Sequence, residues 1–197
     1  MKKILIVDSS PMAENSQTRK ITRKLEDRLR TKYPHAEFSH RDLAQTEIPH
    51  LNAAAITAFM SGEKDPGLKK AAALSDELIE ELLASDLVVI ASPMWNFGVP
   101  SSLKVWVDHI VRAGKTFLFT DKGLLGLASG KKTILITSAG GVYSEGPMKS
   151  SDFMEPYLKR ILGFIGIEDI QSVRVEGVAI PTMAANAILD IPVIGTV

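Results

Sequence analysis

Residues 87–101 read LVVIASPMWNFGVPS and carry the clearest structural signal in the chain. The first five residues form a short apolar run rich in β-branched side chains, which is typical of a strand buried on both faces by helices. Pro100 fits the start of a helix. The apolar residues that follow recur every three or four positions: Leu103, Trp106, Val107, Ile110 and Val111. The loop between strand and helix therefore lies where an open α/β sheet binds its ligand.

The aromatic residues of this loop admit two interpretations. Trp95 and Phe97 could fold back onto the core, as aromatic side chains in loops commonly do. Alternatively, two rings held by flanking prolines could form a wall for a flat aromatic ligand. The other loops at the same edge of the sheet distinguish between these interpretations.

The composition is that of an ordinary globular protein. The 197 residues are 45% apolar and 23% charged, which favours a single domain over residues 1–197. Basic and acidic side chains number 23 each, so neither nucleic acid nor an anionic membrane is an expected partner. Cysteine is absent, which excludes disulfides and thiolate metal sites and favours a cytoplasmic location. No segment approaches the roughly 20 apolar residues that span a bilayer, so no membrane association is expected.

Strand-like and helix-like segments alternate along the chain. Strands are expected at 3–8, 36–41, 87–92, 132–137 and 169–176, and helices at 16–32, 68–84, 101–113 and 152–164. This βαβ rhythm predicts an α/β fold, a doubly wound five-stranded parallel sheet with helices on both faces. Residues 43–65 fit no strand, but Ala53, Ile56 and Met60 suggest a short extra helix.

The loop after the first strand is rich in hydroxyl groups. Ser16 and Thr18 lie at the expected start of the first helix, where unpaired N–H groups and the helix dipole favour a phosphate. Simple N-capping by Ser16 is the alternative. Capping alone does not account for Ser9, Gln17 and Thr18 together, so we predict a phosphate site here.

Residues 137–143 (TSAGGVY) follow the fourth strand. Paired glycines, here Gly140 and Gly141, let a backbone approach a ligand closely and present N–H groups to it, although they could also make a simple turn. A hydroxyl-rich loop, an aromatic loop and a Gly-Gly loop at one edge together indicate a flat ring system that bears a phosphate. Flavin mononucleotide (FMN) fits best.

Other sites receive no support from the sequence. The first loop contains no glycine, which excludes a dinucleotide fingerprint, and residues 130–133 (GKKT) precede a strand rather than follow one as a P-loop does. The four histidines have no metal-ligand spacing, and no G-x-S-x-G elbow is present. No metal site and no hydrolytic nucleophile are expected.

In these loops and beyond them, the chain resembles the FMN-dependent NADH azoreductases, a branch of the flavodoxin-like quinone reductases. The most specific part of the resemblance is 93–100, continued by Leu103, Lys104, Asp108 and 112–117. Further agreement lies at 136–138, 140–141, 156–158, 162–167 and 176–177. The resemblance covers nearly the whole chain and implies a flavodoxin-like fold.

The resemblance also implies an activity. It points to a homodimer with one non-covalent FMN per subunit, which uses NADH or NADPH to reduce a quinone or azo compound by two-electron ping-pong hydride transfer through flavin N5. The flavin supplies the chemistry, so no side chain is expected to be catalytic. The expected cofactor-binding residues are Ser9, Ser16, Gln17, Thr18, Pro93, Met94, Trp95, Asn96, Phe97, Ser138, Gly140, Gly141 and Tyr143.

The chain departs from the family pattern in three places. Trp95 stands where the family commonly has tyrosine, and Ala139 and Tyr143 replace residues that are often polar or basic. Residues 188–197 form an apolar tail in place of a longer polar helix, and we expect this tail to pack on the dimer or on the sheet edge. Two alternatives to a reductase are a one-electron flavodoxin-type carrier and a flavodoxin-like module that has lost its flavin.

Overall fold

The computed structural model describes residues 1–61 and 66–184, and its centre is a five-stranded parallel sheet. The strands, in their order across the sheet, are β2 (Glu37–Asp42), β1 (Lys3–Asp8), β3 (Leu87–Pro93), β6 (Lys132–Ser138) and β7 (Asp169–Val175). Every neighbouring pair is parallel. The predicted sheet is confirmed, and its order places the topological switch between β1 and β3.

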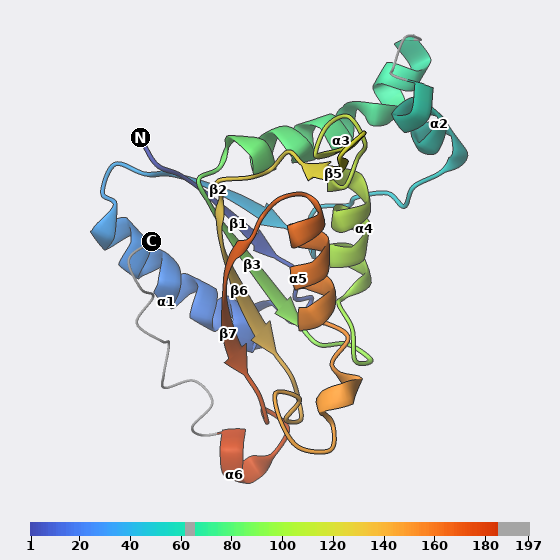
Figure 1. Cartoon of the computed structure of the whole chain (residues 1–197). Helices are drawn as coiled ribbons and strands as arrows, with labels where there is room; N and C mark the ends of the chain where they lie inside the picture. The colour runs from blue at the N-terminus through green and yellow to red at the C-terminus, as the bar shows by residue number, and fades with distance from the viewer. Residues whose placement is uncertain (62–65, 185–197) are drawn as a thin grey trace.

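Helices cover both faces of this sheet, as predicted (Figure 1). The helix α1 (Gln17–Lys32) lies on one face, and α3 (Pro66–Ala84), α4 (Ser101–Ile110) and α5 (Glu155–Phe164) lie on the other. The predicted extra helix is also present as α2 (Ala53–Ser61). Shorter elements are the 3-10 turns Ala13–Asn15 and Lys149–Ser151 and the helix α6 (Pro181–Ala184).

Two apolar cores lie on opposite sides of the sheet because side chains along a strand alternate between its faces. In β1, Leu5 and Val7 pack with the helices α3, α4 and α5, whereas Ile4 and Ile6 pack with α1. The strand β3 is buried along nearly its whole length, as its continuous apolar run predicts for a strand covered on both faces.

Two helices are shorter than the periodicity predicts. The helix α4 ends at Ile110 rather than at 113, because the hydroxyl of Thr116 donates to the Ile110 carbonyl (2.7 Å) and turns the chain. The helix α5 begins at Glu155 rather than at 152, because the Asp152 carboxylate accepts hydrogen bonds from the N–H groups of Met154 (3.0 Å) and Glu155 (3.1 Å). Asp152 therefore fixes the turn that precedes α5, and sequence periodicity locates such boundaries poorly.

A small antiparallel hairpin is absent from the sequence prediction. The strands β4 (Phe117–Thr120) and β5 (Gly123–Gly126) pair with each other between α4 and β6. Gly126 packs tightly on the chain after α5, since a Cβ there would come within 2.2 Å of the Gly166 nitrogen. Each strand has only four residues, and so short a segment shows no clear periodicity.

The strand β2 forms one edge of the sheet, and its charged side chains contact helices on both faces. Arg41 in β2 makes ion pairs with Glu77 and Glu81 of α3, and His40 lies 3.3 Å from Glu26 of α1. At the other end of the chain, the apolar tail 188–197 lies outside the described residues. Among the residues that are described, no helix is both long and apolar enough to cross a membrane.

Candidate functional site

The three loops singled out in the sequence meet at one edge of the sheet. They follow β1, β3 and β6, which are neighbours in the sheet. Backbone hydrogen bonds join them directly, from the Ser9 N–H to the Ala91 carbonyl (3.0 Å) and from the Met94 N–H to the Ser138 carbonyl (2.7 Å). The predicted convergence of the loops is thus confirmed.

In the first loop, the serine hydroxyls have structural partners. Ser16 is the N-cap of α1, and its hydroxyl accepts a hydrogen bond from the Arg19 N–H (3.2 Å) and lies 3.0 Å from the Thr18 hydroxyl. The Ser9 hydroxyl donates to the Ala91 carbonyl (2.9 Å). Ser16 therefore caps α1, and Ser9 joins β1 to β3.

Gln17 differs from its neighbours because its side-chain oxygen lacks a hydrogen-bond partner among the described residues. This Oε1 atom is buried. The side chain lies in the first turn of α1, next to the unpaired N–H groups that every helix start presents. A buried polar atom without a partner is costly. This amide oxygen can accept a hydrogen bond from a donor on a ligand, whereas the N–H groups and the dipole of α1 favour an anion.

Arg19 fastens the first loop to the end of β2. Its guanidinium donates to both carboxylate oxygens of Asp42, at 2.7 Å and 2.6 Å, and its Nε and Nη2 atoms donate to the Ser10 carbonyl at 3.1 Å and 2.9 Å. Burial alone would raise the pKa of Asp42, but the hydrogen bonds from Arg19 and from backbone N–H groups lower it overall. The ion pair stays charged at neutral pH and holds the loop backbone in place.

Asp8, the last residue of β1, is half-buried near this ion pair. Its Oδ1 atom has no hydrogen-bond partner within residues 1–61 and 66–184. Burial raises the pKa of this carboxyl group, and the nearby charge of Arg19 offsets the rise only in part. The ionised form of Asp8 is therefore destabilised by desolvation, and no hydrogen bond from the described residues to Oδ1 offsets this effect.

The second loop contains a tight two-residue turn in an unusual conformation. Trp95 and Gly98 exchange backbone hydrogen bonds of 3.0 Å and 2.9 Å, so Asn96 and Phe97 occupy the corner. Both have positive φ angles, 47° for Asn96 and 67° for Phe97. Asparagine tolerates this region, but phenylalanine rarely adopts it, and such strain concentrates at functional sites.

This turn presents aromatic surface to solvent. Trp95 is 46% exposed and Phe97 is 44% exposed, so neither ring is part of the core and the core-packing interpretation is wrong for both. Met94 and Val99, on either side of the turn, do pack against the core and fix its base. The loop therefore holds its aromatic residues outward on an anchored backbone.

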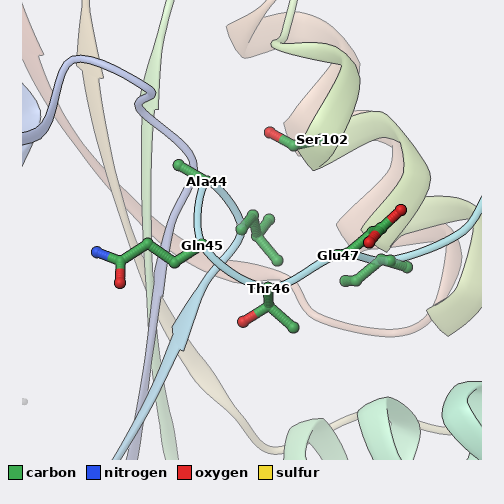
Figure 2. A pocket seen from close by; sticks show the side chains of 7 residues that line it. Ala44, Gln45, Thr46, Glu47 and Ser102 are labelled. Atoms are coloured by element: carbon green, nitrogen blue, oxygen red, sulfur yellow. The ribbon is translucent and has the colours of Figure 1, made fainter.

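A cleft of about 890 Å³ lies beside the turn. Its walls come from the first loop, the end of β2 and the start of α4, and they include Pro11, Ala44, Trp95, Val99 and Lys104. A smaller hollow of about 280 Å³ adjoins it and is lined by residues 43–48 and Ser102 (Figure 2). The larger volume is in the range of ligand sites for small molecules and cofactors.

In the third loop, the backbone carbonyl groups are hydrogen-bonded, whereas two of the N–H groups are not hydrogen-bonded to any described residue. The carbonyls of Ala139, Gly140 and Gly141 accept hydrogen bonds from residues 177–179, at 3.0–3.2 Å. The N–H groups of Gly140 and Gly141 have no partner in the described part of the chain. Neither glycine has a positive φ, so neither is required by a left-handed backbone. The backbone at Gly140 packs closely, because a Cβ there would lie 3.3 Å from the Ala179 side chain.

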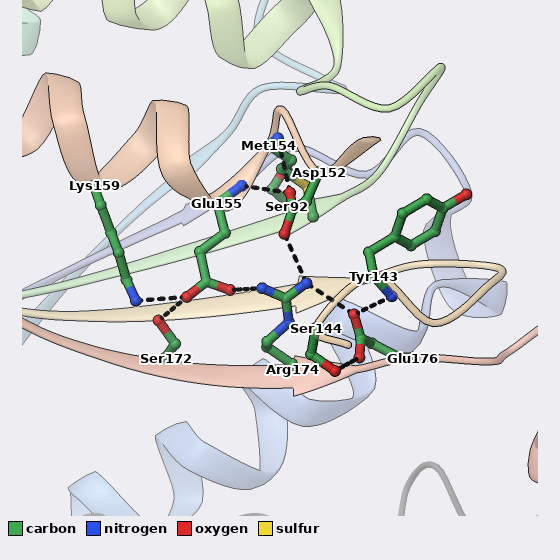
Figure 3. Close-up of polar contacts among 10 residues, drawn as sticks. All are labelled: Ser92, Tyr143, Ser144, Asp152, Met154, Glu155, Lys159, Ser172, Arg174 and Glu176. Atoms are coloured by element: carbon green, nitrogen blue, oxygen red, sulfur yellow. Dashed lines mark hydrogen bonds and ion pairs between the residues drawn. The ribbon is translucent and has the colours of Figure 1, made fainter. Parts of the chain in front are cut away.

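A cluster of charged side chains, absent from the sequence prediction, lies behind the third loop (Figure 3). Arg174 of β7 is its centre and donates to three acidic residues, Asp152, Glu155 and Glu176. Burial would raise the pKa of Glu155, but hydrogen bonds from Lys159 and Ser172 and the charge of Arg174 lower it overall. The signal in the sequence is a pair of charged residues, Arg174 and Glu176, that alternate with the buried Val173 and Val175 at the end of β7.

Comparisons with known proteins agree with this geometry. A family model described as a flavodoxin-like fold matches residues 2–190. The chain belongs to this flavodoxin-like family. The match covers nearly every residue that the structure describes, including all three loops.

Within the flavodoxin-like family, two relatives that are more than 40% identical to this chain share the same name. A protein of Beijerinckia indica named FMN-dependent NADH:quinone oxidoreductase is 48% identical over 190 residues, which cover 95% of this chain and 94% of that protein. A protein of Ralstonia nicotianae with the same name is 44% identical, with 94% and 91% covered. A crystal structure of an azoreductase from Bacillus anthracis superposes with a TM-score of 0.89 at 30% identity, over 95% of this chain and 93% of that one.

Proposed function

We propose that this protein is an FMN-dependent NADH:quinone oxidoreductase that also reduces azo compounds. The observation that carries the proposal is 48% identity over almost the full length of a relative with that name. The exposed aromatic turn, the start of α1 and the free N–H groups of the Gly-Gly loop lie at one edge of the sheet and support the same conclusion.

The site residues fit FMN in three parts. The phosphate would lie at the start of α1, beside Gln17 and Thr18, where the first N–H groups of the helix offer donors. Pro93, Met94, Trp95, Asn96 and Phe97 would lie along the ring. From the third loop, Ser138, Tyr143 and the N–H groups of Gly140 and Gly141 would face the other polar atoms of the ring.

Bound FMN would supply the two-electron chemistry, taking hydride from the nicotinamide and giving electrons to the acceptor. The protein would orient the ring and stabilise negative charge on it. Backbone N–H donors that are already fixed in place, such as those of Gly140 and Gly141, do this without reorganisation. Trp95, exposed beside the cleft, would contact the acceptor, and its indole is broader than the ring of tyrosine.

A coupled assay tests the proposal. The purified protein, reconstituted with FMN, is mixed with NADH or NADPH and either a benzoquinone or an azo dye, and oxidation of the nicotinamide is followed at steady state. Turnover that depends on both FMN and the acceptor supports the proposal, and parallel initial-rate lines support a ping-pong scheme. Uptake of FMN with a persistent semiquinone and no NADH oxidation would instead indicate a one-electron carrier.

The proposal includes three further expectations. Residues 1–197 form one domain, which the two cores on either side of a single sheet support. The functional unit is a homodimer, and analytical ultracentrifugation at micromolar concentration tests this. The location is cytoplasmic, which fractionation of cells tests.

A further inference from the structure

The aromatic turn and the Gly-Gly loop touch through two rings. The centroids of Phe97 and Tyr143 are 6.1 Å apart, with the ring planes at 68°. Tyr143 also lies over its own loop, since a Cβ on Gly141 would come within 3.3 Å of the tyrosine ring. The position of Tyr143 therefore determines how the two loops face each other across the proposed ring site.

Tyr143 is fixed from behind by Glu176. One carboxylate oxygen of Glu176 accepts a hydrogen bond from the Tyr143 N–H (2.9 Å), and the other accepts one from the Ser144 hydroxyl (2.5 Å). Arg174 donates to the same Glu176 carboxylate at 2.8 Å. These contacts, which join β7 to the third loop, are visible in Figure 3.

Arg174 is also linked to Phe97 indirectly, through residues 152–153. Its Nη2 atom donates to the Asp152 carboxylate at 2.7 Å. The N–H of Phe153, the next residue, donates to the Phe97 carbonyl at 3.0 Å. The contacts therefore close a ring that runs from Arg174 through Glu176 and Tyr143 to Phe97, and back through 152–153.

We propose that Glu176, itself held by Arg174, is a positioning residue that keeps Tyr143 against Phe97 as one wall of the site. This inference rests on the proposed FMN-dependent function. Its physical reason is the left-handed conformation of Phe97, which phenylalanine rarely adopts and which surrounding contacts must maintain. A charged, hydrogen-bonded network is well suited to this because its geometry is directional.

Glu155 offers a matched control within the same cluster. It accepts hydrogen bonds from Arg174 (2.5 Å) and Ser172 (2.6 Å), and Lys159 lies 2.7 Å from its Oε1 atom. None of these partners belongs to the three loops. Removing Glu155 breaks a charge pair of Arg174 just as removing Glu176 does, but it leaves the contacts to Tyr143 intact.

The experiment compares Glu176→Ala, Glu176→Gln and Glu155→Ala with the parent protein. Hydrogen exchange of the apoprotein is measured at the Trp95, Gly98 and Phe153 N–H groups, and the Kd for FMN is measured by flavin fluorescence. If the wall is held in its binding conformation about a tenth as often, the apparent Kd rises about tenfold. We expect this rise and faster exchange in Glu176→Ala, recovery of part of both in Glu176→Gln, and neither in Glu155→Ala.

Two outcomes would overturn the inference. One is unchanged exchange and unchanged FMN affinity in Glu176→Ala. The other is an equal rise in Kd and in exchange rate in Glu155→Ala, which would show that the cluster only stabilises the fold in general. If the parent itself fails to bind FMN, the proposed function fails, yet the exchange data still report whether the cluster holds the aromatic turn.

Discussion

The substitution Ser16→Asp separates the two roles of the start of α1, helix capping and phosphate binding. Aspartate caps a helix as well as serine does, and an acidic group at a helix start is favourable by about 0.3–1 kcal/mol. Ser16 already accepts a hydrogen bond from the Arg19 N–H, which the new carboxylate can also accept. We therefore expect the free energy of unfolding of the apoprotein to change by no more than about 1 kcal/mol.

The effect on FMN should be much larger. The phosphate carries a charge of about −1.5 to −2 at pH 7. Two unit charges about 5 Å apart repel each other by about 3 kcal/mol at an effective dielectric constant of about 20. Since each 1.4 kcal/mol is about a tenfold change in Kd, the affinity of Ser16→Asp for FMN should fall by at least about 100-fold.

Fluorescence titration with FMN and with riboflavin, which lacks the phosphate, provides the assay. The parent should prefer FMN strongly, and Ser16→Asp should bind both flavins about equally. Ser16→Ala is the uncharged control, with a cap loss of about 1 kcal/mol and a much smaller loss of FMN affinity. If Ser16→Asp keeps the full preference of the parent for FMN, the phosphate does not lie at the start of α1 and our reasoning is refuted.

Three other predictions concern stability and can be measured by urea unfolding. Leu103→Ala, at a fully buried position on α4, should lower the free energy of unfolding by about 3 kcal/mol, and a cost below about 1 kcal/mol would contradict the packing described here. Arg19→Leu should cost about 2–3 kcal/mol, below the roughly 3–5 of a fully buried pair because the Asp42 side chain is 24% exposed; no change would mean that the ion pair does not form in solution. Asp8→Asn should stabilise the protein at pH 7 and leave it unchanged at pH 3. Burial holds the pKa of Asp8 above its ordinary 3.8, so the folded state disfavours the ionised form, and this penalty appears as pH rises through that range and vanishes below it. A destabilised Asp8→Asn at pH 7 would show that the carboxylate has a favourable partner.

The sheet and its helices were predictable because their signals are local. A five-residue apolar run such as that in β3 indicates a buried strand without knowledge of its neighbours. The β4–β5 hairpin was not predictable in this way, since its strands have four residues each and Gly126 owes its place to a contact with Gly166 from another part of the chain. Contacts between distant segments leave no periodic pattern in the sequence.

The same distinction holds at the candidate site. The sequence placed the three loops at one edge, because parallel strands all end there. It did not reveal the pairing of Arg19 with Asp42, or that of Arg174 with Asp152 and Glu176, because these partners are brought together only by the fold. Nor could it show that Phe97 has a positive φ, a conformation usually associated with glycine or asparagine.

The charged edge strand β2 also affects how copies of this chain can associate. A flat, apolar edge is a template on which a second chain can add a strand and extend the sheet. Here the edge strand bears charged side chains, and Arg41 among them is paired with Glu77 and Glu81. Charges on an edge strand disfavour continuous sheets and fibres seeded at β2.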